Sequence, residues 1–83
     1  MKQTDLGKAI ERLRAGDWQA AHAIVQEDEE DRLSCWAHGI VHVLEGDESN
    51  ARYWYRRAKR PFPSPFSAEA ELKALDDEAR NGS

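Results

Sequence analysis

The chain has 83 residues, of which 40% are apolar and 34% are charged, and its formal net charge is −4. This length excludes a second domain and leaves a thin core, because a chain of this size buries only about 60% of the surface that its unfolded form exposes. The negative charge argues against general binding to nucleic acid, and the single cysteine excludes an internal disulfide and is typical of a reducing, intracellular compartment.

The N-terminal third of the chain has the pattern of two short helices. Its first residues are polar and lead into helical sequence without the apolar segment of a signal peptide or a membrane span, so we expect a cytoplasmic protein with no membrane contact. Apolar residues at spacings of three and four predict a helix over about 4–15, which Gly16 ends. Asp17 is a good N-cap for a second helix. The two helices form a first hairpin over about 4–27, with the inward residues Leu6, Ala9, Ile10, Leu13, Trp18, Ala21, Ile24 and Val25.

Five consecutive carboxylates over 27–31 separate this hairpin from a second one over about 31–60. Like charges repel one another, so the run predicts an exposed connection, and it lacks the glycine and the alternating ligands of a calcium loop. The next helix ends at Gly46, and Asp47 caps a following helix that extends to about Lys59. The expected apolar stripes of these helices are Leu33, Trp36, Ala37, Ile40, Val41 and Leu44, followed by Ala51, Trp54, Tyr55 and Ala58.

Three prolines over 61–66 predict a semi-rigid, extended connector, because proline cannot continue a helix. Phe62 and Phe66 are expected to hold this connector against the core. A C-terminal helix over about 67–80 follows, capped by Ser64 or Ser67. Its few apolar residues stand in a charged background, so we expect this helix either to dock as a cover or to fray.

The turns within the two hairpins repeat one motif. Gly16 to Ala21 and Gly46 to Ala51 both read Gly-Asp-x-x-x-Ala, thirty positions apart. Glycine accepts the left-handed backbone of a tight turn, aspartate caps the next helix, and alanine allows close helix packing. Over about 32–63 the second hairpin resembles the tetratricopeptide repeat and its Sel-like relative, through the small, aromatic and proline positions Gly39, Ala51, Tyr55, Ala58 and Pro63. The first hairpin matches only in its turn and in its alanine.

This resemblance implies an all-α fold of two antiparallel hairpins plus a C-terminal helix, and a function as a protein-protein interaction module. Such arrays hold a partner protein or peptide on a surface lined by the first helix of each hairpin. That lining would here consist of Leu6, Ile10, Leu13, Leu33, Trp36, Ile40 and Val43. Two hairpins are fewer than a stable stack needs, so these residues are either plain core or are covered by the C-terminal helix, by a second copy in a homodimer, or by a partner.

Three histidines indicate an alternative function in metal binding. His38 and His42 lie four residues apart and share a helix face with Glu45, and His22 comes from the preceding helix. Two imidazoles at this spacing bind zinc or another transition metal when a further ligand joins them. Gly39 stands where a zincin has its glutamate, so protease chemistry is not indicated. The competing interpretation is that these histidines form hydrogen bonds at a half-buried packing edge.

The segment 52–60 carries five basic and three aromatic residues and is a second candidate for ligand binding. Basic and aromatic residues together can bind an anionic ligand, although cations near a helix C-terminus also stabilise its dipole and the acidic run can neutralise them. Asn50, Tyr53 and Arg57 fall on one helix face. With the histidines of the facing helix they form either a small polar pocket or a buried hydrogen-bond network.

Catalysis and a resident cofactor have no motif in this chain. The sequence contains no glycine-rich phosphate loop, no nucleophile elbow and no paired thiols. Cys35 has no second thiol near it and is expected to be a small buried hydrophobic residue. The sequence therefore predicts an interaction module that is not an enzyme, with binding of a metal or a small anionic ligand as the alternative.

Overall fold

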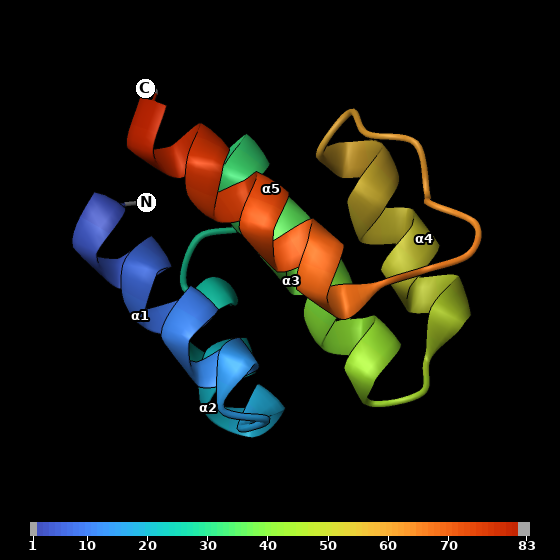
Figure 1. Cartoon of the computed structure of the whole chain (residues 1–83), viewed down its shortest axis with the longest axis horizontal. Helices are drawn as coiled ribbons and strands as arrows, with labels where there is room; N and C mark the ends of the chain where they lie inside the picture. Colours follow the sequence, from blue (N-terminus) through green and yellow to red (C-terminus); the bar gives the residue numbers. More distant parts are fainter. Residues whose placement is uncertain (1, 82–83) are drawn as a thin grey trace.

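A computed structural model describes residues 2–81, and its regular secondary structure is helical throughout that range (Figure 1). The helices are α1 (Gln3–Arg14), α2 (Trp18–Val25), α3 (Arg32–Leu44), α4 (Glu48–Arg57) and α5 (Ala68–Asn81). The predicted all-α class is confirmed. The helix ends lie within a residue or two of the positions expected from the glycines, the aspartates and the prolines.

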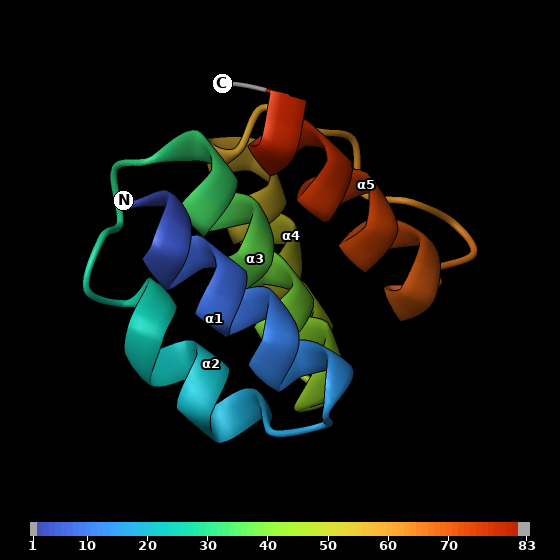
Figure 2. The same ribbon diagram turned by 60° about the vertical axis from the view of Figure 1, so that its left-hand side comes forward.

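The same backbone turn follows α1 and α3. Gly16 and Gly46 have φ angles of 81° and 88°, in the left-handed region that residues with a Cβ disfavour. The aspartate after each glycine then caps the next helix, because its carboxylate accepts a hydrogen bond from the backbone N–H three residues on, at 3.2 Å for Asp17 and 3.4 Å for Asp47. The tight turns return the chain, so that α2 packs on α1 and α4 packs on α3 (Figure 2).

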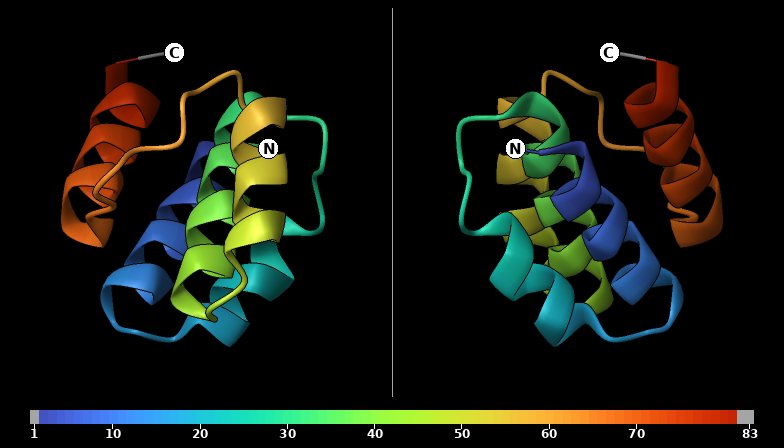
Figure 3. Two further views of the ribbon diagram at one scale, coloured as in Figure 1. Left: turned by 90° about the vertical axis from the view of Figure 1, so that its right-hand side faces the viewer. Right: turned by 90° about the vertical axis from the view of Figure 1, so that its left-hand side faces the viewer.

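α3 is the central helix and contacts every other helix. α5 lies on one side of α3 and α4 lies on the other (Figure 3). Gly39 allows the contact with α4 to be close, since a Cβ at this position would lie 2.5 Å from Cδ1 of Tyr55. The largest fully buried side chains come mainly from α3 and its neighbours: Trp36, Tyr55, Ile40, Leu75, Val25 and Val41.

α5 docks over α1 and α3 through a small apolar stripe and one carboxylate. Leu72 and Leu75 are 4% and 0% exposed and join the core. Glu71 accepts hydrogen bonds from Nε1 of Trp36 at 3.1 Å and from the hydroxyl of Tyr55 at 2.7 Å. Both donors belong to buried side chains, which need a partner when they are removed from water. Of the two outcomes expected for the C-terminal helix, the structure has the docked one.

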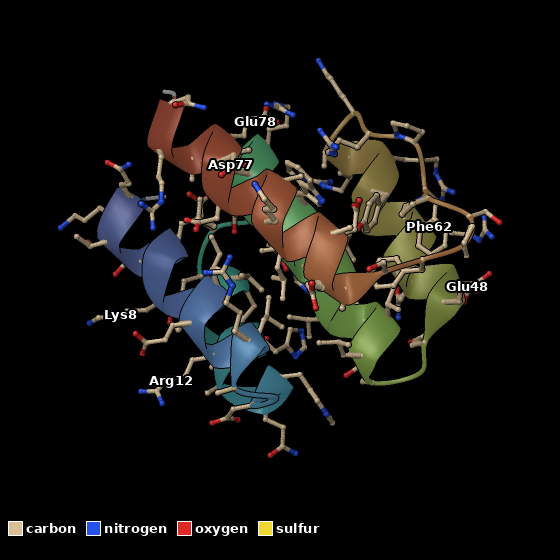
Figure 4. The ribbon with its side chains drawn as sticks, viewed as in Figure 1. Lys8, Arg12, Glu48, Phe62, Asp77 and Glu78 are labelled. Carbon is tan, nitrogen blue, oxygen red and sulfur yellow. The ribbon has the colours of Figure 1, made fainter. Side chains whose placement is uncertain are left out.

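Polar contacts also hold the two ends of α5. Of the two serines considered as caps, Ser67 accepts a hydrogen bond from the backbone N–H of Ala70 at 3.2 Å. Near the other end, Glu78 forms ion pairs with Arg32 and with Arg60, the latter at 3.5 Å (Figure 4). By contrast, Lys8 and Arg12 point outward from α1, on its side away from α5 (Figure 4).

The apolar lining expected to meet a partner lies inside the protein. Its fully buried members, all 4% exposed or less, are Leu6, Ile10, Leu13, Trp36 and Ile40, and its half-buried members are Leu33 and Val43. α5 packs against α1 and α3, the two helices that carry these residues. Of the alternatives for this surface, the structure has the one in which these residues belong to the core and the C-terminal helix covers them, so they are not free to line a partner-binding surface. Leu44, predicted to face the core, is 37% exposed because it is the last residue of α3, next to the turn.

Candidate metal centre

The three histidines come from two helices that belong to different hairpins. His22 lies on α2, and His38 and His42 lie one turn apart on α3. α2 and α3 pack directly against each other. The Oγ of Ser34 donates a hydrogen bond to the carbonyl of Val25 at 3.2 Å and joins the end of α2 to the beginning of α3. This arrangement places His22 of α2 beside His38 and His42 of α3.

Their ring nitrogens converge on one point. One ligand nitrogen from each of His22, His38 and His42 lies within 4.8 Å of the other two. The Nε2 atoms of His22 and His38 are 3.2 Å apart. The ring centroids are separated by 4.9 Å, 5.3 Å and 5.0 Å, so each ring contacts both of the others. The structure thus brings together the three residues that the sequence proposed as metal ligands.

His38 is the most buried of the three and is held as a neutral imidazole. The residue is 3% exposed, and its ring stacks on the indole of Trp54, with centroids 3.8 Å apart and planes 8° apart. Burial, together with neighbouring His42 and His22, lowers the pKa of His38 from 6.5 to about 3. Neutral imidazole is the form that coordinates metals. Its Nδ1 atom is buried and has no hydrogen-bond partner among the described residues.

His42 is oriented by a carboxylate from its own helix end. Its Nδ1 atom lies 2.5 Å from Oε1 of Glu45, and its side chain is 9% exposed. A carboxylate that accepts the Nδ1 hydrogen leaves the lone pair on Nε2. Histidine ligands in metalloproteins commonly have such a carboxylate behind them, because it fixes the tautomer and makes the ring a stronger donor. Glu45 therefore leaves the lone pair of His42 on Nε2.

The spacing of these nitrogens suits a transition-metal ion. A tetrahedral zinc ion with Zn–N distances of about 2.0–2.1 Å holds its nitrogen ligands about 3.3 Å apart. The 3.2 Å between the Nε2 atoms of His22 and His38 has this value. The widest separation in the group is at most 4.8 Å. A bound ion would therefore require the more widely separated nitrogens to move toward each other.

The expected polar pocket does not form around the histidines. Asn50 donates from Nδ2 to Asp47 at 2.8 Å and is exposed. Arg57 donates to the hydroxyl of Tyr53 at 3.3 Å and to the carbonyl of Glu29 at 2.7 Å. Tyr53 is 42% exposed. Partners at the N-cap of α4, within α4 and in the acidic connection hold these side chains, so they do not line a pocket with His38 and His42. The alternative, a hydrogen-bond network, is present between Tyr53 and Arg57 but is exposed and not buried.

Several cations of the basic segment are used within the fold. Arg52 pairs with Glu48 at 3.0 Å and lies over the ring of Phe62, labelled in Figure 4. Arg57 approaches Glu30 of the acidic run at 3.6 Å. The guanidinium of Arg60, besides its pair with α5, lies 3.5 Å from the ring centroid of Trp36. These contacts favour the structural interpretation of the segment over a surface for anionic ligands.

Cys35 takes no part in the histidine cluster. It is 2% exposed, its Sγ atom donates a hydrogen bond to the carbonyl of Glu29 at 3.3 Å, and burial raises the pKa of its thiol. It is the small buried residue that the sequence predicted. The role of Trp54 as a wall against His38 was not foreseen, although both positions were assigned to facing helices.

Comparisons with known proteins give no relative from which a function of this site could be inferred. No protein-family model, no curated protein and no solved structure matches this chain. Within residues 2–81, none of the helices has the length and apolar character needed to cross a membrane.

Proposed function

We propose that this protein binds a transition-metal ion through His22, His38 and His42. The observation that carries the proposal is the convergence of one nitrogen from each ring to within 4.8 Å, across two hairpins. In the metal-free protein, the Nε2 atoms of His22 and His38 share a hydrogen bond at 3.2 Å, and an ion would replace this contact by binding the same two atoms. The ring of His38 is also neutral at ordinary pH, so it is ready to coordinate without losing a proton.

Imidazole ligands narrow the class of ion. Nitrogen donors of this kind suit zinc, copper, nickel and cobalt, whereas magnesium and calcium prefer oxygen. A bound ion would join α2 of the first hairpin to α3 of the second. An ion that binds only the folded state stabilises that state, so it would add to the stability that the thin core of this chain of 83 residues provides.

We propose that the protein works in the reducing cytoplasm, consistent with its single buried cysteine.

Metal analysis and thermal unfolding test this function. The protein should be purified without a histidine tag and without chelators, and then dialysed against Zn²⁺ or Ni²⁺. We expect one ion per chain and a rise in melting temperature, since an ion at 100 times its dissociation constant stabilises the fold by about 2.7 kcal/mol. Absence of bound metal, together with an unchanged melting temperature for both ions, would overturn the proposal.

Variants locate the bound ion. His22 is the half-buried ligand, so His22→Ala should fold and lose metal affinity by more than the roughly 10–100-fold that follows loss of a supporting carboxylate. Glu45→Gln should cost roughly 10–100-fold, because it acts through the ring of His42. Gln19→Ala, on the same helix and exposed, is the matched control and should bind as the parent does. Equal affinity of the parent and His22→Ala would place the ion elsewhere.

A protein-interaction function remains the second candidate, supported by the packing of Gly39 on Tyr55, which suits the small and aromatic positions of a tetratricopeptide-like hairpin. It has less support than metal binding because α5 covers the apolar faces of α1 and α3. Light scattering tests its homodimer form. A monomer of 9.5 kDa at high concentration would remove self-association from this candidate.

A further inference from the structure

The histidine cluster supplies fewer ligands than a transition-metal ion takes. Zinc and cobalt sites are normally four-coordinate. Among residues 2–81, the three histidines form this group, and a second group of possible ligands joins His42 to Glu45 and Asp47. The nearest other candidates are engaged elsewhere, since Glu45 binds Nδ1 of His42, Asp47 binds Asn50 and Cys35 binds a backbone carbonyl. One coordination position is therefore left for a ligand that this part of the chain does not provide.

The environment of the rings places that position on the side of α2. His38 and His42 are 3% and 7% exposed, and the ring of Trp54 closes off one face of His38. His22 is the member of the cluster that solvent reaches, because it is half-buried on the short helix α2. A small molecule would enter past His22. The opposite approach is blocked by the packed α3–α4 contact at Trp54.

Charge decides which molecules suit the position. Three neutral imidazoles leave the double positive charge of the ion uncompensated. The carboxylate of Glu45 lies behind His42 and offsets part of this charge through the ring. The remaining positive charge favours an anionic fourth ligand or a bound water that loses a proton, which on zinc has a pKa near 7.

We infer that the metal-loaded protein binds a small monodentate anion at the fourth coordination position, on the His22 side of the cluster. This inference rests on the proposed metal-binding function and goes beyond it. Azide, thiocyanate, carboxylates and hydroxide share the required chemistry, namely one negatively charged donor atom on a compact ion. Structural metal sites with four protein ligands lack such an exchangeable position.

Cobalt substitution tests the inference separately from metal binding. Co²⁺ is added to the tag-free chain, its visible absorption is recorded, and sodium azide is then titrated into the sample. We expect a cobalt spectrum on loading, followed by a saturable spectral change with azide. Thiocyanate should compete for the same position and shift the azide midpoint to higher concentration.

The possible outcomes separate the two claims. A cobalt spectrum that azide leaves unchanged would overturn the anion site and leave the metal-binding proposal intact. Light scattering of the same sample would then identify a dimer if a second copy supplied the fourth ligand. No cobalt spectrum, with no bound cobalt after dialysis, would overturn both claims. The Gln19→Ala control should reproduce the azide response of the parent, since its side chain is exposed and lies outside the cluster.

Discussion

The two sides of α3 differ in how their buried groups are satisfied. On the side that faces α5, Trp36 is fully buried and its indole N–H donates to Glu71. On the side that faces α2, His38 is almost as buried, yet its Nδ1 atom has no partner among the described residues. Arg60, which lies over Trp36, also keeps a buried nitrogen, Nε, without a partner among the described residues. The α2 side differs in that three imidazole rings converge there. Because three possible metal ligands meet on the α2 side, that side is the better candidate for function.

The α5 side should show the largest loss of stability. Leu75→Ala removes a fully buried side chain of α5 from the core and should lower the free energy of unfolding by about 2–5 kcal/mol. Urea denaturation measures this loss. Metal affinity should change little, because Leu75 lies on the side of α3 away from the histidines. If Leu75→Ala lost metal binding but kept the stability of the parent, the proposal that the α5 side stabilises the fold and the α2 side binds the metal would be contradicted.

The α4 contact of α3 should tolerate no added volume. Gly39→Ala places a Cβ 2.5 Å from Cδ1 of Tyr55 and 3.2 Å from the carbonyl of Ala51, so we expect a loss of about 1–3 kcal/mol in the free energy of unfolding. Gly7→Ala is the matched control, because a Cβ there meets nothing within 4 Å on helix α1. The control should gain about 0.5–1 kcal/mol from the better helix propensity of alanine. Equal effects of the two substitutions would contradict the close α3–α4 approach.

The histidine side should make the metal-free protein sensitive to mild acid. The pKa of His38 is lowered from 6.5 to about 3 on folding, so the unfolded chain binds this proton first. The stabilising contribution is complete above pH 6.5 and is lost progressively as the pH falls toward 3. Between pH 7 and pH 5, the free energy of unfolding should fall by about 2 kcal/mol. Urea denaturation at the two pH values measures the change, and a smaller dependence in His38→Gln would assign it to this ring.

Local signals in the sequence were sufficient to predict the helices and the turns between them. Gly16 and Gly46 take the left-handed conformation, and Asp17 and Asp47 cap the following helices as predicted. These features depend on neighbouring residues only, which explains why they can be read from the chain. The convergence of the histidines was also predictable in part, since residues four apart on α3 share a face.

Tertiary contacts could not be predicted in the same way. Glu71 reaches Trp36 and Tyr55 only because α5 crosses α3, and no spacing in the sequence indicates that crossing. The stacking of Trp54 on His38 depends equally on the exact approach of α4 to α3. The spacing correctly placed Arg57 beside Tyr53, but it could not show that this face of α4 lies near the acidic connection and not near the histidines.

The position of α5 also determines the order in which the chain can complete its fold during synthesis. α1 and α3 are made before the helix that covers them, so Trp36 and its apolar neighbours stay exposed to water until Leu72 and Leu75 have left the ribosome. The hydrogen bonds from Trp36 and Tyr55 to Glu71 can form only at the same stage. A nascent chain that stalls before α5 therefore presents an open apolar face, of the kind that chaperones bind.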